Sequence, residues 1–244
     1  MKHTKKATFM RKDDELPEYM LEAVKKVSDH FKIKRDKNYL YAFCGMFKKS
    51  KHWNPERIRE DVEAWKASFT KSFPQRNNIA EIIKEAFSNC SSKDDINDLR
   101  GYLLEALLIG LKGGFNGIDK PGRNSRGWGA KVYLEYDGKS KGVYYECSEH
   151  KFVGCSNRST VDYGEWVGRH GQFYECKVSP KRITCKEIQY MKHLKSELED
   201  KEFSHELSFL CAESNLNVRL KLEEYNLRPV FKPCGLEEIY SMLS

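Results

Sequence analysis

Two acids and a lysine on either side of a glycine-punctuated turn could carry out metal-dependent chemistry. Asp162 precedes the turn, and Glu175 and Lys177 follow it. Because side chains alternate between faces along a strand, Glu175 and Lys177 share one face if residues 172–179 are extended. If residues 159–166 form the antiparallel partner arm, Asp162 lies close to Glu175. Two carboxylates at one point predict an oxygen-ligand site for a hard divalent cation, with Lys177 beside it.

The same residues resemble the motif of the PD-(D/E)XK nuclease family, in which an acid on one strand is followed, after a hairpin, by an acid, any residue and a lysine. The matching positions are Asp162 and the run Glu175-Cys176-Lys177, with Val161 where a proline is usual. The resemblance implies that Asp162, Glu175 and the backbone carbonyl of Cys176 hold Mg²⁺, with Mn²⁺ as a substitute. Lys177 would orient or help to deprotonate the attacking water, and its pKa should fall beside a dication.

Two further residues are expected at the site, one from a helix before the strands and one from a helix after them. Leucines surround Glu105 in the helix predicted over 95–111, so its carboxylate needs a partner, solvent or a metal. The later helix begins with Thr184 and Glu187 in capping-box spacing and carries Gln189 on its polar side. The family often takes an acid from the first helix and a Gln or Lys from the second. The resemblance therefore implies that Glu105 joins the metal ligands and that Gln189 supports the site.

Other arrangements of these residues stay open. Glu135, Asp137 and Glu146 flank a predicted hairpin turn at Asp137-Gly138, and any of them could replace Asp162 if the strand order differs. Glu175 and Lys177 could also be an ion pair on a solvated strand face, because such spacings arise often in a chain with 32% charged residues.

The eight cysteines show no paired spacing, which favours reduced cysteines in the core. Cys147, His150 and Cys155 could instead hold zinc together with Cys176, although the chain contains no C-x-x-C. That alternative would make the chain a zinc-binding regulatory protein.

Positive charge is concentrated near the N-terminus. Residues 1–95 hold 21 Lys and Arg against 15 Asp and Glu, which is +6 of the net charge of +7. Such a surface attracts a polyanion, so residues 1–94 form either a nucleic-acid-binding domain or a structural cap. Apolar residues at helical spacing predict an all-helical domain there, with helices over 17–31, 38–50, 55–65 and 79–87.

Residues 95–244 combine predicted helices and strands in the order helix, strands, hairpin, helix, strand, with a further strand over 218–225 and a closing helix. This order predicts an α/β fold. The resemblance implies a restriction-endonuclease-like mixed sheet flanked by helices, preceded by the helical N-terminal domain.

The function that the resemblance implies is metal-dependent hydrolysis of phosphodiester bonds, as in a DNA endonuclease of prokaryotic restriction or antiviral defence. DNA is favoured over RNA because most of the family cuts DNA. The chain could act alone or beside a separate ATPase or helicase subunit. A catalytically inert nucleic-acid-binding subunit with the same fold is the alternative.

Bulk composition adds an expectation about location. Apolar residues make up 39% of the chain, and its mean hydropathy is −0.72. No apolar run reaches the length of a membrane span, and the first residues lack the apolar middle of a signal peptide. We therefore expect a cytoplasmic protein.

Overall fold

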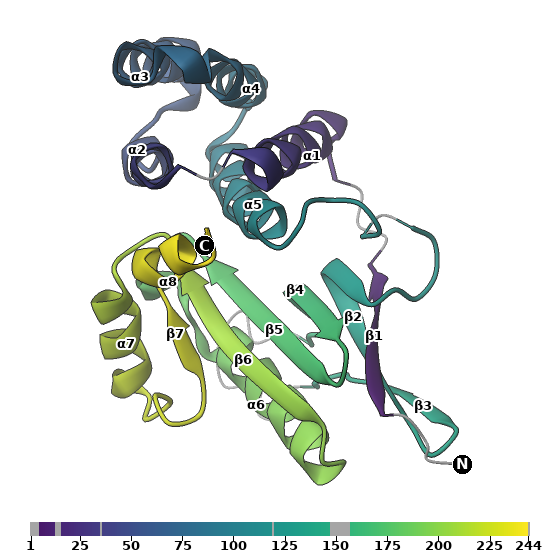
Figure 1. The fold of residues 1–244 in the computed structure, drawn as a ribbon. Coiled ribbons are helices and arrows are strands. Elements are labelled where there is room, and N and C mark those ends of the chain that lie inside the picture. Colours follow the sequence, from purple (N-terminus) through teal and green to yellow (C-terminus); the bar gives the residue numbers. More distant parts are fainter. Residues whose placement is uncertain (1–4, 13–15, 35, 119, 147–156, 244) are drawn as a thin grey trace. The chain divides into compact units, whose positions relative to one another are not determined.

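The computed structural model describes residues 5–12, 16–34, 36–118, 120–146 and 157–243. The contacts divide the chain into a sheet unit of residues 1–14 and 116–235 and a helical unit of residues 15–115 and 236–244. The predicted mixed α/β fold, with helices around a mixed sheet and further helices in the N-terminal half, is confirmed (Figure 1). This division differs from the boundary predicted at residue 94. Residues 1–14 belong to the sheet unit, and residues 95–115 and 236–244 belong to the helical unit.

The sheet unit is built on a seven-stranded mixed sheet within the described residues. The order along the sheet is β1-β2-β4-β5-β6-β7, and β3 pairs with β2. Neighbours from β1 to β5 are antiparallel, whereas β5, β6 and β7 run parallel. The strands are β1 (Lys6–Arg11), β2 (Arg126–Tyr136), β3 (Lys139–Gly142), β4 (Thr160–Val167), β5 (His170–Lys177), β6 (Ser204–Cys211) and β7 (Lys232–Cys234).

Parallel pairing requires a crossover connection between the strands, and here two helices supply it. α6 (Cys185–Asp200) links β5 to β6 after a 3₁₀ turn, and α7 (Asn215–Glu224) links β6 to β7. α6 packs its apolar side against the sheet, and the shared core includes Phe173, Ile188, Met191, Leu194 and Phe209. The face of the sheet that carries Phe173 is therefore the face that α6 covers.

The strand predicted over 218–225 is wrong, because residues 218–224 lie in α7 and Tyr225 is its C-cap. Its alternating sequence fits either structure, but Val218 and Leu222 are buried four residues apart, on one side of a helix. Ser214 caps the helix by accepting a hydrogen bond from the Asn217 N–H. The strand of the C-terminal segment is β7, a little further along.

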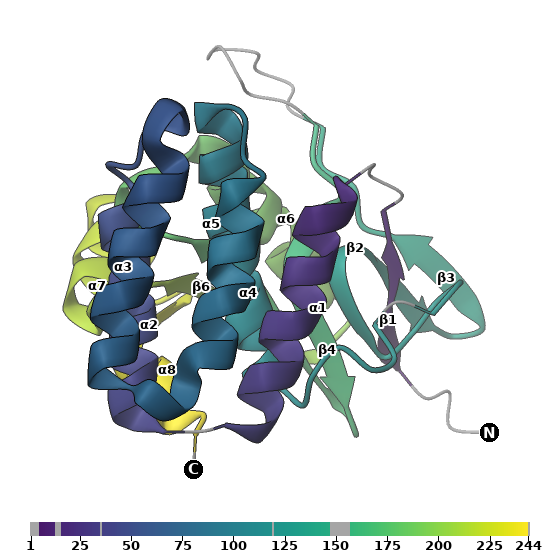
Figure 2. The ribbon, with the colours of Figure 1, turned by 90° about the horizontal axis from the view of Figure 1, so that it is seen from above.

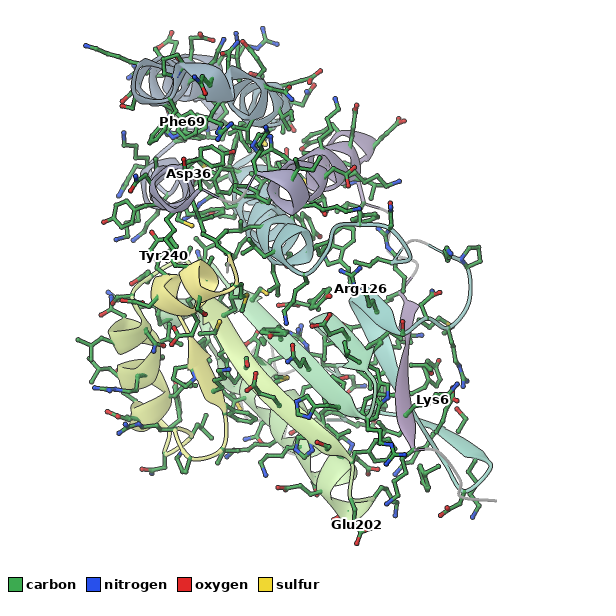
Figure 3. The ribbon with its side chains drawn as sticks, in the orientation of Figure 1. Lys6, Asp36, Phe69, Arg126, Glu202 and Tyr240 are labelled. Carbon is green, nitrogen blue, oxygen red and sulfur yellow. The ribbon has the colours of Figure 1, made fainter. Side chains whose placement is uncertain are left out.

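β1 corrects the expectation that residues 1–94 are all helical. Ala7 and Phe9 are buried, and β1 pairs with β2 from Lys6 opposite Glu135 to Arg11 opposite Ala130. Figure 3 shows Lys6 and the first residue of β2, Arg126, at opposite ends of this pair. A six-residue strand among lysines carries little apolar signal of its own, so pairing with a distant strand decides its structure.

The helical unit confirms the helices predicted in the N-terminal half. Figure 2 shows α3 and α4 side by side, with α1 next to α4. No helix in the described part of the chain has the length and apolarity to cross a membrane. The helices are α1 (Glu18–Ile33), α2 (Lys37–Ser50), α3 (Ile58–Ser72), α4 (Asn77–Ser88), α5 (Lys93–Leu111) and α8 (Leu236–Ser241).

A pair of glycines makes room for Phe9 on the sheet. Gly127 in β2 and Gly164 in β4 are register partners, and the Phe9 side chain lies against both. A Cβ added to Gly164 would lie 2.1 Å from Cε1 of Phe9, far inside van der Waals contact. The Phe9 and Phe173 ring centroids are 5.8 Å apart, so the ring joins the core beneath α6.

We predict that Gly164→Ala lowers the free energy of unfolding by roughly 1–3 kcal/mol, the usual cost of overpacking a core. Urea denaturation followed by circular dichroism measures the change. In a Phe9→Ala background the new methyl group no longer meets the ring, so the same substitution should cost much less. Equal costs in the two backgrounds would contradict this account.

Candidate active site

The β4–β5 hairpin brings the two predicted acids together. Its register pairs Tyr163 with Tyr174, which places Asp162 beside Glu175 on the face that α6 covers. Asp162 Oδ2 also accepts the backbone N–H of Cys176 at 2.7 Å. The Glu175 side chain is fully buried, and that of Asp162 is 17% exposed.

Lys177 joins the acids as the alternation of side chains predicts. Its Nζ donates to Glu175 Oε1 at 2.6 Å and lies 3.7 Å from Asp162 Oδ2. The structure therefore brings Asp162, Glu175 and Lys177 to one point at the C-terminal end of β5.

Arg158 is a fourth member of the site that the sequence analysis missed. Its Nη2 donates to Asp162 Oδ1 at 3.1 Å and to Glu175 Oε2 at 2.5 Å. Its Nε donates to the carbonyl oxygen of Thr160 at 3.0 Å, and only 10% of the side chain is exposed. Arg158 lies four residues before Asp162. Residues at an even spacing along extended chain share one face, so this spacing could have suggested that Arg158 lies beside Asp162.

Glu187 is the fifth member, contributed by the first turn of α6. One carboxylate oxygen, Oε2, closes the predicted capping box by accepting from the N–H and hydroxyl of Thr184. The other, Oε1, lies 3.6 Å from both Arg158 Nη1 and Lys177 Nζ. A single side chain thus caps the helix and pairs with both cations.

Gln189 was the residue predicted to support the site from this helix. Two residues along a helix turn the side chain by about 200°, so Gln189 and Glu187 lie on different sides of α6. Glu187 is buried against the cations, whereas Gln189 is half-buried. Glu187 therefore makes the contacts to Lys177 and Arg158, and a role for Gln189 stays a prediction.

Burial and the closeness of two acids set the protonation of the carboxylates. Burial, followed by repulsion from Asp162, raises the pKa of Glu175 to about 7. For Asp162 burial alone would raise the pKa, but Lys177, Arg158 and the Cys176 N–H more than offset it and lower the pKa. Near neutral pH the two acids therefore differ, with Asp162 charged and Glu175 close to half-protonated.

The same interactions hold both cations in their charged forms. Burial would lower the pKa of Lys177, but attraction to Glu175, Asp162 and Glu187 outweighs it and raises the pKa. This direction is opposite to the lowering expected beside a dication, because here the nearest charges to the ammonium are carboxylates. The pKa of Arg158 is likewise raised by the carboxylates despite burial.

The donors at this point suit a hard divalent cation. Asp162 Oδ1 and Glu175 Oε2 both accept a hydrogen bond from Arg158 Nη2. The distance between these two oxygens is therefore no greater than the sum of the two hydrogen-bond lengths. The backbone carbonyl of Cys176, on the same strand, stays the third predicted ligand. Among the described residues no group of three or more His, Cys, Asp or Glu side chains is arranged to hold a metal ion. Two carboxylates completed by a carbonyl and water therefore form the metal site to be tested.

Glu105 belongs to a different unit from the other predicted site residues. It is buried in α5 of the helical unit, whereas Asp162 and Glu175 lie in the sheet unit. Its membership of the metal site stays a prediction.

The spare acids and the zinc alternative have separate outcomes. Glu135 accepts a hydrogen bond from the Thr8 hydroxyl at 2.9 Å and forms an ion pair with Lys6 at 3.1 Å. Asp137 lies in the β2–β3 turn. The acid beside Glu175 is therefore Asp162 and neither of these two. Cys147, His150 and Cys155 lie outside the described residues, and Cys176 is buried on β5.

The comparisons with known proteins leave the site without a named relative. No protein-family model matches the chain, and no curated protein matches its sequence. Among solved structures, protein VC1899 from Vibrio cholerae aligns with a TM-score of 0.39 and 9% identity, over 98% of this chain and 57% of that one. The chain thus spans little more than half the length of that protein, and a likeness this low carries no argument about function.

The two roles of Glu187 can be separated by substitution. Glu187→Gln keeps an oxygen for the Thr184 N–H but removes the charge, whereas Glu187→Ala removes both. We expect Glu187→Ala to lose more stability to urea than Glu187→Gln, by about 1 kcal/mol, the usual worth of a helix cap.

Asp95 supplies a matched control for that comparison, because it closes the capping box of α5. Its Oδ2 accepts the Ser92 N–H, and the Ser92 hydroxyl accepts the Asp95 N–H. The loss in Glu187→Gln should exceed the loss in Asp95→Asn, since only Glu187 pairs with an arginine and a lysine. Equal losses in these two variants would show that the ion pairs add nothing.

Proposed function

We propose that this chain is a metal-dependent nuclease that hydrolyses phosphodiester bonds, most consistent with a DNA endonuclease of restriction or antiviral defence. The observation that carries the proposal is the convergence of Asp162, Glu175 and Lys177 in one buried cluster at the end of the β4–β5 hairpin. These are the positions that match the PD-(D/E)XK motif, and the α/β fold around them is compatible with that family.

The residues divide the work of hydrolysis between them. Asp162, Glu175 and the Cys176 carbonyl would hold Mg²⁺ or Mn²⁺, which when bound polarises a phosphate oxygen and offsets the charge that builds there. Lys177, which contacts Glu175 and lies near Asp162, would orient the attacking water or help to deprotonate it. The water oxygen forms the new bond to phosphorus and loses one proton to the solvent, the bond to the leaving oxygen breaks, and that oxygen takes up a proton from the solvent.

A nucleic-acid substrate also agrees with the charge of the helical unit. Lys32 and Lys34 are exposed around the end of α1, and Lys48 and Lys49 are exposed at the end of α2. Exposed lysines bind phosphates without regard to sequence. We therefore propose that the helical unit contributes affinity, with DNA favoured over RNA as the polymer.

A second candidate function has one observation in its favour. The guanidinium of Arg158 already neutralises both predicted metal ligands at hydrogen-bond distance. A chain in which Arg158 keeps this place permanently would bind nucleic acid without cutting it. Cation binding and cleavage together separate this inert subunit from the nuclease.

The purified chain should cleave plasmid DNA only with Mg²⁺ or Mn²⁺, and folded Glu175→Gln or Lys177→Met variants should not cleave it. Supercoiled DNA, linear DNA, single-stranded DNA and RNA are compared on gels. Because cation binding needs the deprotonated carboxylate, the Mg²⁺ concentration for half-maximal cleavage should rise as pH falls through about 7, the pKa of Glu175. Glu105→Gln should slow cleavage at unchanged thermal stability if Glu105 joins the site.

Glu197→Gln is the matched control for these variants, because it also removes a charge from an ion pair of the sheet unit, but the pair joins α6 to Lys141 of β3, away from Glu175 and Lys177. It should cut as the unchanged chain does. Cleavage that persists in EDTA or in folded Glu175→Gln would contradict the proposed site. DNA binding by an unchanged chain that neither binds the cation nor cleaves any substrate, alone or with an added ATPase or helicase subunit, would favour the inert alternative.

The affinity of the helical unit for phosphates predicts a change in salt dependence. Replacing Lys32 and Lys34 by Gln should weaken DNA binding in EDTA and flatten the slope of log K against log salt by up to about 0.9 for each lost phosphate contact. Fluorescence anisotropy of labelled duplex DNA over a NaCl titration measures both. Lys66→Gln with Lys84→Gln is the control, because these lysines already pair with Glu81 and Glu63. Equal slopes for the two double variants would contradict a role of Lys32 and Lys34 in DNA binding and would favour the helical unit as a structural cap.

A further inference from the structure

One nitrogen of Arg158 contacts both carboxylates that the proposed nuclease would use. Nη2 lies 3.1 Å from Asp162 Oδ1 and 2.5 Å from Glu175 Oε2. The second oxygen of each carboxylate has another partner, because Asp162 Oδ2 accepts the Cys176 N–H at 2.7 Å and Glu175 Oε1 accepts Lys177 Nζ at 2.6 Å. Arg158 therefore contacts Asp162 Oδ1 and Glu175 Oε2, the two carboxylate oxygens that a divalent cation would bind.

We propose that Arg158 is a built-in counter-ion of this site, and that a divalent cation binds by displacing its guanidinium from Asp162 and Glu175. The inference rests on the proposed function, since it concerns the same two carboxylates. It adds to that function the way in which cation access is controlled.

The charges favour exchange over simultaneous binding. Once Glu175 has lost its proton, Asp162, Glu175 and Glu187 carry three negative charges, and Arg158 and Lys177 carry two positive charges. A dication by itself matches the two negative charges of Asp162 and Glu175, so a guanidinium at hydrogen-bond distance from the same two carboxylates would be repelled toward its remaining acidic partner, Glu187. Repulsion between neighbouring cations is strong where water does not screen it.

The structure already contains a place for the displaced guanidinium. Nη1 of Arg158 lies 3.6 Å from Glu187 Oε1, and Nε is anchored on the Thr160 carbonyl at 3.0 Å. The guanidinium carbon lies 5.8 Å from the centre of the buried Tyr190 ring, within the range of a cation–π contact. A small rotation of the guanidinium toward Glu187 would free both oxygens while these other contacts stay in place.

Cation binding by the EDTA-treated chain of 244 residues tests the proposal without relying on catalysis. Free Mn²⁺ is measured from its EPR signal during titration of the unchanged chain, Arg158→Met and Arg126→Met. We expect Arg158→Met to bind Mn²⁺ at least tenfold more tightly than the unchanged chain, and to show a lower Tm without cation that Mn²⁺ restores. Arg126→Met is the control, because Arg126 also pairs with a buried acid, Glu165, but on a different part of the sheet unit.

A folded Arg158→Met that binds Mn²⁺ no more tightly than the unchanged chain would overturn the proposal, as would an equal gain in Arg126→Met. If Arg158→Met does not fold without cation, Mn²⁺ should refold it, and failure to refold would also count against the proposal. Arg158→Lys then provides a second test, because one ammonium cannot reproduce the guanidinium fork and should give an affinity between those of the other two proteins.

The outcomes also separate this inference from the nuclease assignment. An unchanged chain that binds Mn²⁺ and cuts DNA, with no gain in Arg158→Met, removes only the role of Arg158. A gain in Mn²⁺ affinity without cleavage by any variant supports the role of Arg158 and removes the nuclease. Absence of Mn²⁺ binding in both the unchanged chain and Arg158→Met removes both.

Discussion

The burial of opposite charges at the end of the β4–β5 hairpin is the constraint on which the site depends. An unpaired carboxylate or guanidinium is very costly away from water, so each charge in this cluster requires the others. Glu175 is fully buried yet contacts two cations, and Arg158 and Lys177 each contact more than one acid. The cluster therefore forms only when β4, β5 and the first turn of α6 are all in their places.

The surrounding fold supplies those places through contacts of quite different kinds. Parallel pairing of β5 with β6 requires a crossover connection, and the helix in that connection, α6, covers the face that holds Asp162 and Glu175. Glu187 then ties the start of that helix to the cations, because its two oxygens serve the helix cap and the ion pairs separately. Local helix geometry and site geometry are in this way set by a single side chain.

The electrostatics of the cluster also shape the chemistry that it can perform. The carboxylates around Lys177 raise its pKa, so within this cluster its ammonium is charged and donates hydrogen bonds. Glu175, with a pKa of about 7, can hold or release a proton near neutral pH. Whichever cation neutralises this pair, guanidinium or metal, also sets the charge that a phosphate would meet.

The sequence by itself determined the features that depend on neighbours along the chain. Alternation along a strand was enough to put Glu175 and Lys177 on one face, and the turn between the arms was enough to bring Asp162 beside them. The capping box of Thr184 and Glu187 was equally local.

Only the tertiary structure decided the rest. Glu187 joins the cluster because helix packing brings α6 onto the strands, and the four-residue spacing of Arg158 from Asp162 does not by itself show that the guanidinium also reaches Glu175 and Glu187. β1 is a strand because β2 offers it a partner, and residues 218–224 are helical because their alternating pattern fits two structures and packing selects one. Short stretches of sequence determine which side chains share a face of a strand or helix, whereas the partners of a buried charge depend on how the whole chain folds.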